Sequence, residues 1–279
     1  SGKIRITDFS LLFMKYQGNY FMKKTLIALA VAASAAVSGS AMAWTASGTG
    51  GSVDLGGTLT PVEKVTPWEV KVGDGVTNLD ADVQKGQKEI RISVAKAIPV
   101  LGIRNANANG FNGGAGIHPQ IDYNGAIDLN GFRDGTTTLT LEVTGAGGQK
   151  LGALSAPFSS AAVSSWNGSK PGSMAVISTA PGESFYGGLG KNGSAIRQNA
   201  SLELIGALSS DFVAKWVQQG TRWYSSAAAS FDDPNTLYYA AYGSGIESGK
   251  NITITLKEGA SGNAPIRWNA SLPIAVTYQ

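Results

Sequence analysis

The side chains that most often perform catalysis or bind metals are nearly absent from this chain. Its 279 residues include one histidine, His118, and no cysteine. Zinc and copper sites of the usual kind need several such ligands, so we expect no metal site. A Ser-His-Asp triad would have to use His118, and no Gly-x-Ser-x-Gly motif accompanies it. A histidine in a loop or at a strand edge is the simpler interpretation.

The carboxylates do not point to a catalytic pair either. Asp232 and Asp233 stand directly before Pro234, which is a pattern typical of a turn. A glycosidase needs two facing carboxylates, and sequence spacing alone does not exclude them. Because titratable groups are so sparse, we predict a protein that is not an enzyme and that has no catalytic residues and no cofactor.

The first 43 residues have the pattern of an export signal that follows unrelated sequence. Residues 1–21 have the character of read-through upstream of a gene start. Residues 22–43 are expected to be a signal peptide, with two lysines, an apolar run and an A-x-A cleavage site at Lys23-Lys24, Leu26–Val37 and Ala41–Ala43. The apolar run is shorter than the roughly 20 residues that span a bilayer, which disfavours a transmembrane anchor.

Removal of this leader changes the charge of the protein. Residues 1–43 hold five of the 22 basic residues and one of the 19 acidic residues, so the other 236 residues have 17 and 18 and a net charge of −1. The pI of about 9.0 therefore reflects the leader, and we expect no nucleic-acid partner. An exported chain without disulfides must be stabilised by packing or by assembly.

The longest alternating pattern lies at the C-terminus. Every even position from 266 to 278 is apolar, and the odd positions are mostly polar or small. This period of two predicts one long strand with a single buried face, which includes Leu272, Ile274, Val276 and Tyr278. Such a strand must be paired by another part of the fold or by another protein.

Shorter alternating segments separated by Gly-rich turns predict an all-β antiparallel sandwich. They lie near 68–72, 90–94, 139–143 and 252–256. One long insertion, about 160–242, departs from this pattern. In it we expect two short helices, about 197–208 and 211–218, the second capped by Ser209 or Ser210.

The N-terminal arm, residues 44–60, begins with a Gly/Ser/Thr-rich stretch that cannot pack by itself. Residues 52–60 then alternate, with Val53, Leu55 and Leu59 on one face. Spacing alone leaves two interpretations open. The segment is either the first strand of its own domain or a strand that inserts into another molecule.

These features together resemble a known family, the major subunit of K88-type adhesive fimbriae. These are chaperone–usher pili of enterotoxigenic enterobacteria. The resemblance covers residues 44–279 and is densest at both ends. It is carried by the leader from Met22, GSVDLGGTLTP and WEVKVGDG near the N-terminus, FYGGL at 185–189, YGSGIESG at 242–249, and LPIAVTY at 272–278.

The resemblance implies an incomplete immunoglobulin-like sandwich over residues 61–279 that lacks its last strand. A periplasmic chaperone would fill the resulting groove first, pairing with the C-terminal strand, and the outer-membrane usher would export the subunit. The arm of the next identical subunit would then fill the groove as a donor strand through Val53, Leu55 and Leu59. The expected location is a fimbrium on the bacterial cell surface, reached through the periplasm.

The resemblance also implies binding of host-cell glycans or glycoproteins through the insertion. Aromatic platforms with nearby polar groups suit sugars, which makes Trp166, Trp223 and Tyr224, with Lys170 and Arg222, the candidates. Packing of the insertion onto the sandwich is their alternative role. The sequence departs from the K88 pattern between Ala162 and Glu183, so the family's sugar-contacting residues are not transferred.

Two other functions stay open: a minor or tip subunit of such a fimbria, and a free secreted carbohydrate-binding sandwich. A tip subunit needs no donor arm, so the intact arm favours a repeating subunit.

Overall fold

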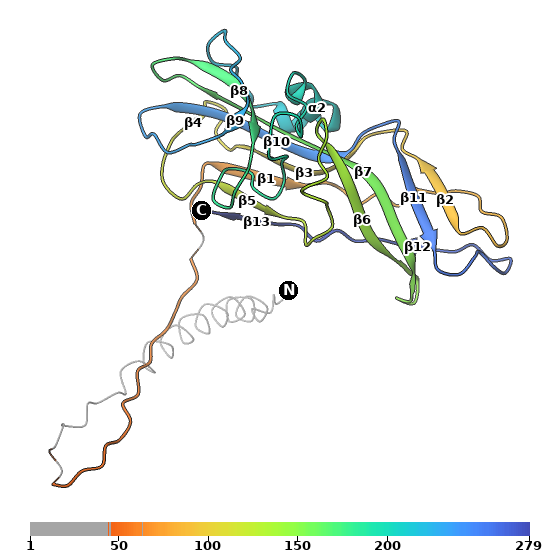
Figure 1. Cartoon of the computed structure of the whole chain (residues 1–279), viewed down its shortest axis with the longest axis horizontal. Coiled ribbons are helices and arrows are strands. Elements are labelled where there is room, and N and C mark those ends of the chain that lie inside the picture. The colour runs from red at the N-terminus through yellow and green to blue at the C-terminus, as the bar shows by residue number, and fades with distance from the viewer. Residues whose placement is uncertain (1–43, 45, 63) are drawn as a thin grey trace, which may run out of the picture. The chain divides into compact units, whose positions relative to one another are not determined.

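The computed structural model describes residues 44, 46–62 and 64–279 (Figure 1). The chain divides into two units, residues 1–64 and the compact unit 65–279. The upstream segment 1–21 and the signal peptide 22–43 expected from the sequence lie outside the described residues. Within the described part of the chain, no helix is long and apolar enough to cross a membrane.

The compact unit is built mainly of antiparallel strands, in agreement with the all-β prediction. Its elements are β1 (Trp68–Val72), β2 (Glu89–Ser93), β3 (Ile98–Asn105), β4 (Phe111–Asn112), β5 (Pro119–Asp122), β6 (Thr136–Gly145), β7 (Lys150–Trp166), β8 (Gly172–Ile177), α2 (Ser201–Leu208), the 3₁₀-helix η1 (Ser210–Val213), β9 (Ala227–Ala228), β10 (Leu237–Ile246), β11 (Asn251–Leu256), β12 (Trp268–Asn269) and β13 (Ala275–Tyr278).

Strand β7 organises the main sheet. Its N-terminal half pairs with β6 and β11, and its C-terminal half pairs with β10 and β8. The hydrogen-bonded path β1-β3-β10-β7-β11-β2 extends the sheet to both sides. A separate two-stranded sheet, β13 with β5, lies on one face, and α2 lies on the other (Figure 1).

Two apolar cores account for this layering. The larger core joins the main sheet to β5 and β13, and it includes Trp68, Phe111 and Phe231, whose rings meet edge to face. The smaller core packs α2 and η1 onto β7 and β10 through Leu204, Ile205, Leu208, Phe212 and their neighbours. Strand β7 is therefore buried on both faces over Ser159–Ser165, which explains why this segment is rich in Ala and Ser and does not alternate.

The FYGGL segment supports β5. The Phe185 amide donates to the Pro119 carbonyl (2.6 Å), and the Ile121 amide donates to the Tyr186 carbonyl (2.7 Å). Phe185 is fully buried at φ 63° and stacks on Tyr242, with ring centroids 5.6 Å apart. This segment thus holds β5 in the position where it pairs with the C-terminal strand.

The C-terminal strand is shorter than the sequence predicts. Only 268–269 and 275–278 form strands, while residues 270–274 are extended without a partner. Pro273 has no N–H to donate, and nothing in the described chain pairs with this stretch. The alternation itself is confirmed, because the even positions from 268 to 278 are half-buried against the larger core and the odd positions are exposed.

The helices also differ in extent from the prediction. Instead of helices over about 197–208 and 211–218, the chain forms α2 over Ser201–Leu208 and one turn of 3₁₀-helix over Ser210–Val213. The expected insertion, about 160–242, starts within β7 and ends within β10.

Glycine at position 187 is required for contact with β5. Gly187 has φ +89°, and a Cβ there would lie 1.9 Å from the Ile121 carbonyl oxygen. We expect Gly187→Ala to destabilise the protein by about 3 kcal/mol or more, from the left-handed backbone and the clash together. Gly148→Ala is the matched control, because Gly148 has φ +79° with nothing within 4 Å. Equal urea-unfolding midpoints for the two variants would contradict this explanation.

Candidate functional site: an open apolar groove

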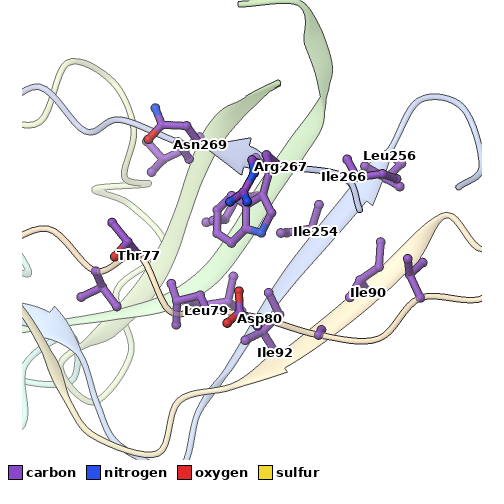
Figure 2. A pocket seen from close by; sticks show the side chains of 18 of the residues that line it. Thr77, Leu79, Asp80, Ile90, Ile92, Ile254, Leu256, Ile266, Arg267 and Asn269 are labelled. Carbon is purple, nitrogen blue, oxygen red and sulfur yellow. The ribbon is translucent and has the colours of Figure 1, made fainter. Parts of the chain in front are cut away.

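An apolar groove of about 990 Å³ opens in the compact unit. Its floor is formed by aliphatic side chains of the main sheet, and Figure 2 shows four of them, Ile90 and Ile92 on β2 and Ile254 and Leu256 on β11. Leu139 of β6 and Leu154 of β7 also line the groove. Charged side chains line only its exposed rim, at Asp74, Asp80, Asp82, Lys85 and Arg267. The groove therefore favours an apolar occupant.

Two extended segments border this groove. One, residues 74–83, is held at its ends by the Gly73 amide on the Val100 carbonyl (2.8 Å) and the Gly86 amide on the Ala260 carbonyl (2.7 Å). The other is the C-terminal stretch 270–274. Neither segment makes a backbone–backbone hydrogen bond with any described residue. Both present free N–H and C=O groups along an apolar trough, which is the arrangement that accepts an added strand.

The four residues expected on the C-terminal strand divide between groove and core. Leu272 and Ile274 line the groove. Val276 and Tyr278 lie in β13, paired with β5, and pack against the larger core. Burial raises the pKa of Tyr278, and the neighbouring Thr66 side chain partly opposes that rise. The start of the compact unit is held at this end of the C-terminal strand, because the Trp68 indole N–H donates to the Ile117 carbonyl (2.6 Å) and His118 pairs with Gln279.

The predicted donor-strand residues are solvent-exposed in the N-terminal unit. Val53, Leu55 and Leu59 are 86%, 94% and 97% exposed. The described residues of the arm form no helix or strand. Three aliphatic side chains with this exposure in one short segment are unusual for a surface that has no partner.

The five predicted ligand residues do not form one site. Residues 222–224 run beside the start of β8, so successive side chains point to opposite sides. Tyr224 faces Trp166 (centroids 5.5 Å apart), whose indole N–H donates to the Lys170 carbonyl (2.8 Å). Trp223 points the other way, toward Trp216 (6.3 Å).

The sequence did not identify Trp216 as a candidate ligand residue. Its ring lies 6.3 Å from that of Trp223, so the segment that follows the helices also contributes to this surface. Burial also separates the two tryptophans that were predicted. Trp166 packs against the larger core, whereas Trp223 is 43% exposed and donates its indole N–H to the Gln218 side chain (3.2 Å). Trp166 is therefore a packing residue, and Trp223 presents its ring to solvent.

His118 has a structural environment, as expected for a strand-edge histidine. Its Nδ1 lies 2.9 Å from the Gly182 carbonyl oxygen, and its Nε2 lies 3.1 Å from an Asp232 carboxylate oxygen. Its backbone pairs in both directions with Gln279. Among the described residues, no three His, Cys, Asp or Glu side chains are grouped to hold a metal ion.

The fold and the groove define a class of protein: an all-β sandwich with a small helical insert and an open apolar groove. Comparison with known sequences shows its family. The family described as "Fimbrial, major and minor subunit" matches residues 22–279. The K88 fimbrial proteins AB and AC of Escherichia coli are each 33% identical to this chain, over 92% of this chain and 100% of each relative. The F41 fimbrial protein of Escherichia coli is 29% identical over the same shares.

The chain therefore belongs to the K88 fimbrial subunit family, as the sequence motifs predicted. It is a fimbrial subunit of the bacterial cell surface, and it assembles with other subunits into a fibre. The family is a structural class of protein.

The different burial of the two tryptophans predicts different effects on stability. We expect Trp166→Ala to cost about 2 kcal/mol of unfolding free energy, less than a fully buried tryptophan would. Trp223→Ala leaves an exposed position and should cost less than about 1 kcal/mol. Urea unfolding of the two purified variants measures this difference. A larger loss for Trp223→Ala would reverse the assignment of packing and surface roles.

Proposed function

We propose that this protein is a repeating, non-enzymatic shaft subunit that polymerises by donor-strand exchange. In this proposal, residues 52–60 of one subunit insert into the apolar groove of the next. The observation that carries it is the groove itself, an aliphatic trough bordered by two segments with free backbone groups.

The arm and the groove match in length and chemistry. Nine residues of extended chain span about 30 Å, and the groove's border at residues 74–83 has ten residues. Insertion would bury Val53, Leu55 and Leu59, each contributing about 1.5–3 kcal/mol, and would supply partners for the free backbone groups. Gly57 falls on the same face and leaves its position without a side chain.

The polarity of insertion follows from where the arm begins. Trp68 bonds to Ile117 and His118 pairs with Gln279, so the first residues of the compact unit, to which the arm is joined, lie at the Tyr278 end of the C-terminal strand. If the donor arm entered the groove from this same end, the arms of the two subunits would begin side by side. The two subunits could then exchange arms and form a closed dimer instead of a fibre. A donor that runs antiparallel to the C-terminal strand enters from the Ala260 end and gives an open fibre. We propose the antiparallel orientation.

The same groove supports a role for the export partners. A free aliphatic trough would expose the subunit to aggregation in the periplasm. A periplasmic chaperone that pairs with the C-terminal strand would cover it until the usher exchanges chaperone for donor arm. A free secreted sandwich would instead stay monomeric without a chaperone, which sizing of the protein expressed with and without one distinguishes.

A second proposed function is the binding of host glycans. The supporting observation is the exposed Trp223 ring beside Trp216 at the end of the insertion. An exposed indole suits the apolar face of a sugar, and Gln218 and the neighbouring backbone provide polar groups.

The donor arm is tested by charging its buried face. We expect Leu55→Asp to block polymerisation and leave the chaperone-bound subunit soluble, because a carboxylate would be buried in an apolar groove. Thr58→Asp is the control, since Thr58 points away from the groove in an inserted strand and should permit fibres. Electron microscopy of both strains decides the matter, and normal fibres from Leu55→Asp would remove the arm from the mechanism.

The C-terminal strand is tested in the same way. We expect Val276→Asp, or deletion of Tyr278 and Gln279, to abolish capture by the chaperone and to cause periplasmic degradation. Thr277→Asp adds the same charge on the exposed face and should be captured normally. Pull-down with the chaperone measures both, and wild-type recovery of Val276→Asp would contradict the assigned face.

Glycan binding is tested at the exposed ring. We expect Trp223→Ala fibres to bind a soluble monovalent glycan about tenfold more weakly, with unchanged assembly. A monovalent ligand is needed because multivalent attachment masks the loss at one site. Val217→Ala is the control for a neighbouring exposed apolar side chain. Wild-type affinity of Trp223→Ala would move the glycan site elsewhere.

A further inference from the structure

The tip formed by residues 166–173 and 218–226 holds a second feature on the side opposite Trp223. The Ser173 amide donates to the Arg222 carbonyl (3.0 Å), and the Tyr224 amide donates to the Ser173 carbonyl (2.8 Å). These bonds fix the extended backbone of 222–224. The side chains of Arg222 and Tyr224 therefore share one side of this segment.

On that side Arg222 packs over Tyr224. The Arg222 guanidinium carbon lies 4.5 Å from the centre of the Tyr224 ring, and Tyr224 also contacts Trp166, with the two ring planes tilted by 37°. Gly172 lets the tyrosine ring lie against the backbone, since a Cβ there would be 2.2 Å from Tyr224 Cε2. A guanidinium placed over a fixed ring loses little rotamer freedom when it binds a ligand.

The charge of the tip is uniformly positive. Residues 166–173 and 218–226 contain Lys170 and Arg222 and no Asp or Glu. Both cations are exposed, and neither forms an ion pair with any described carboxylate. This contrasts with Arg104 and Arg197, whose guanidinium groups are paired with carboxylates.

We propose that the stack of Arg222 on Tyr224 is a subsite for an anionic sugar, whose carboxylate or sulfate group binds the guanidinium. A planar guanidinium binds such oxyanions through two parallel hydrogen bonds, and Lys170 adds favourable charge. This inference rests on the proposed glycan-binding function. One glycan chain would reach over the edge of the tip, with a neutral sugar on Trp223 and its acidic sugar on Arg222.

The test titrates assembled fibres with three soluble oligosaccharides. Lactose is the neutral probe, and 3′-sialyllactose and 3′-sulfolactose are the acidic probes. We expect at least one acidic probe to bind more tightly than lactose, with an advantage that falls as salt rises. Arg222→Gln should weaken that probe about tenfold and leave lactose binding unchanged. Arg222→Lys keeps the charge without the paired hydrogen bonds and should fall between the two.

A matched control separates this site from general charge. Lys96→Gln removes one exposed positive charge from another part of the protein and should leave all three affinities unchanged. Comparison of the two acidic probes distinguishes a carboxylate from a sulfate ligand. The proposal is overturned if neither acidic probe binds better than lactose, or if Arg222→Gln changes acidic and neutral binding equally. In that case a loss of lactose binding in Trp223→Ala would still support the proposed glycan function.

Discussion

The rest of this subunit depends on one constraint: the backbone of the C-terminal segment lacks a hydrogen-bonded partner strand. Residues 270–274 carry an apolar inward face and free backbone groups, yet no described residue pairs with them. The facing segment 74–83 is in the same condition. The gap leaves a groove over an aliphatic floor whose named side chains are only 3–8% exposed, so what it leaves open is chiefly the backbone of its two borders. The donated strand proposed here would cover that floor and pair both borders at once.

The remainder of the fold keeps this gap well defined. Strand β7 is buried on both faces over Ser159–Ser165, by the larger core and by the helical insert, and its N-terminal half continues into the groove floor at Leu154. The FYGGL segment fixes β5, and β5 pairs with β13, so the C-terminal strand is held at its end and open along its middle. In our proposal, glycan binding takes place elsewhere, on the exposed tip formed by residues 166–173 and 218–226. Substitutions in this tip would not disturb the groove.

Much of this organisation was readable from the sequence, and the exceptions have physical reasons. Alternation at 266–278 predicted the inward face of the C-terminal segment because a strand beside a core must alternate. The same alternation could not show that residues 270–274 lack a partner, since pairing is a property of the neighbours. The aromatic residues of the insertion were identified by type. Their division between two sides depends on the bridge between Ser173 and Trp223, which joins segments fifty residues apart and leaves no local signal. Strand β7 was not predicted, and over Ser159–Ser165 burial on both faces removes the alternation that marks a strand.

The central claim is that the groove of each subunit is filled by the arm of its neighbour. A helical reconstruction of the assembled fibre by electron cryo-microscopy tests it most directly. The account predicts density for residues 52–60 of one subunit within the groove of the next, antiparallel to the C-terminal strand, with Leu55 pointing toward the floor of Ile92 and Ile254. An empty groove in the fibre, or one filled by the subunit's own arm, would contradict it.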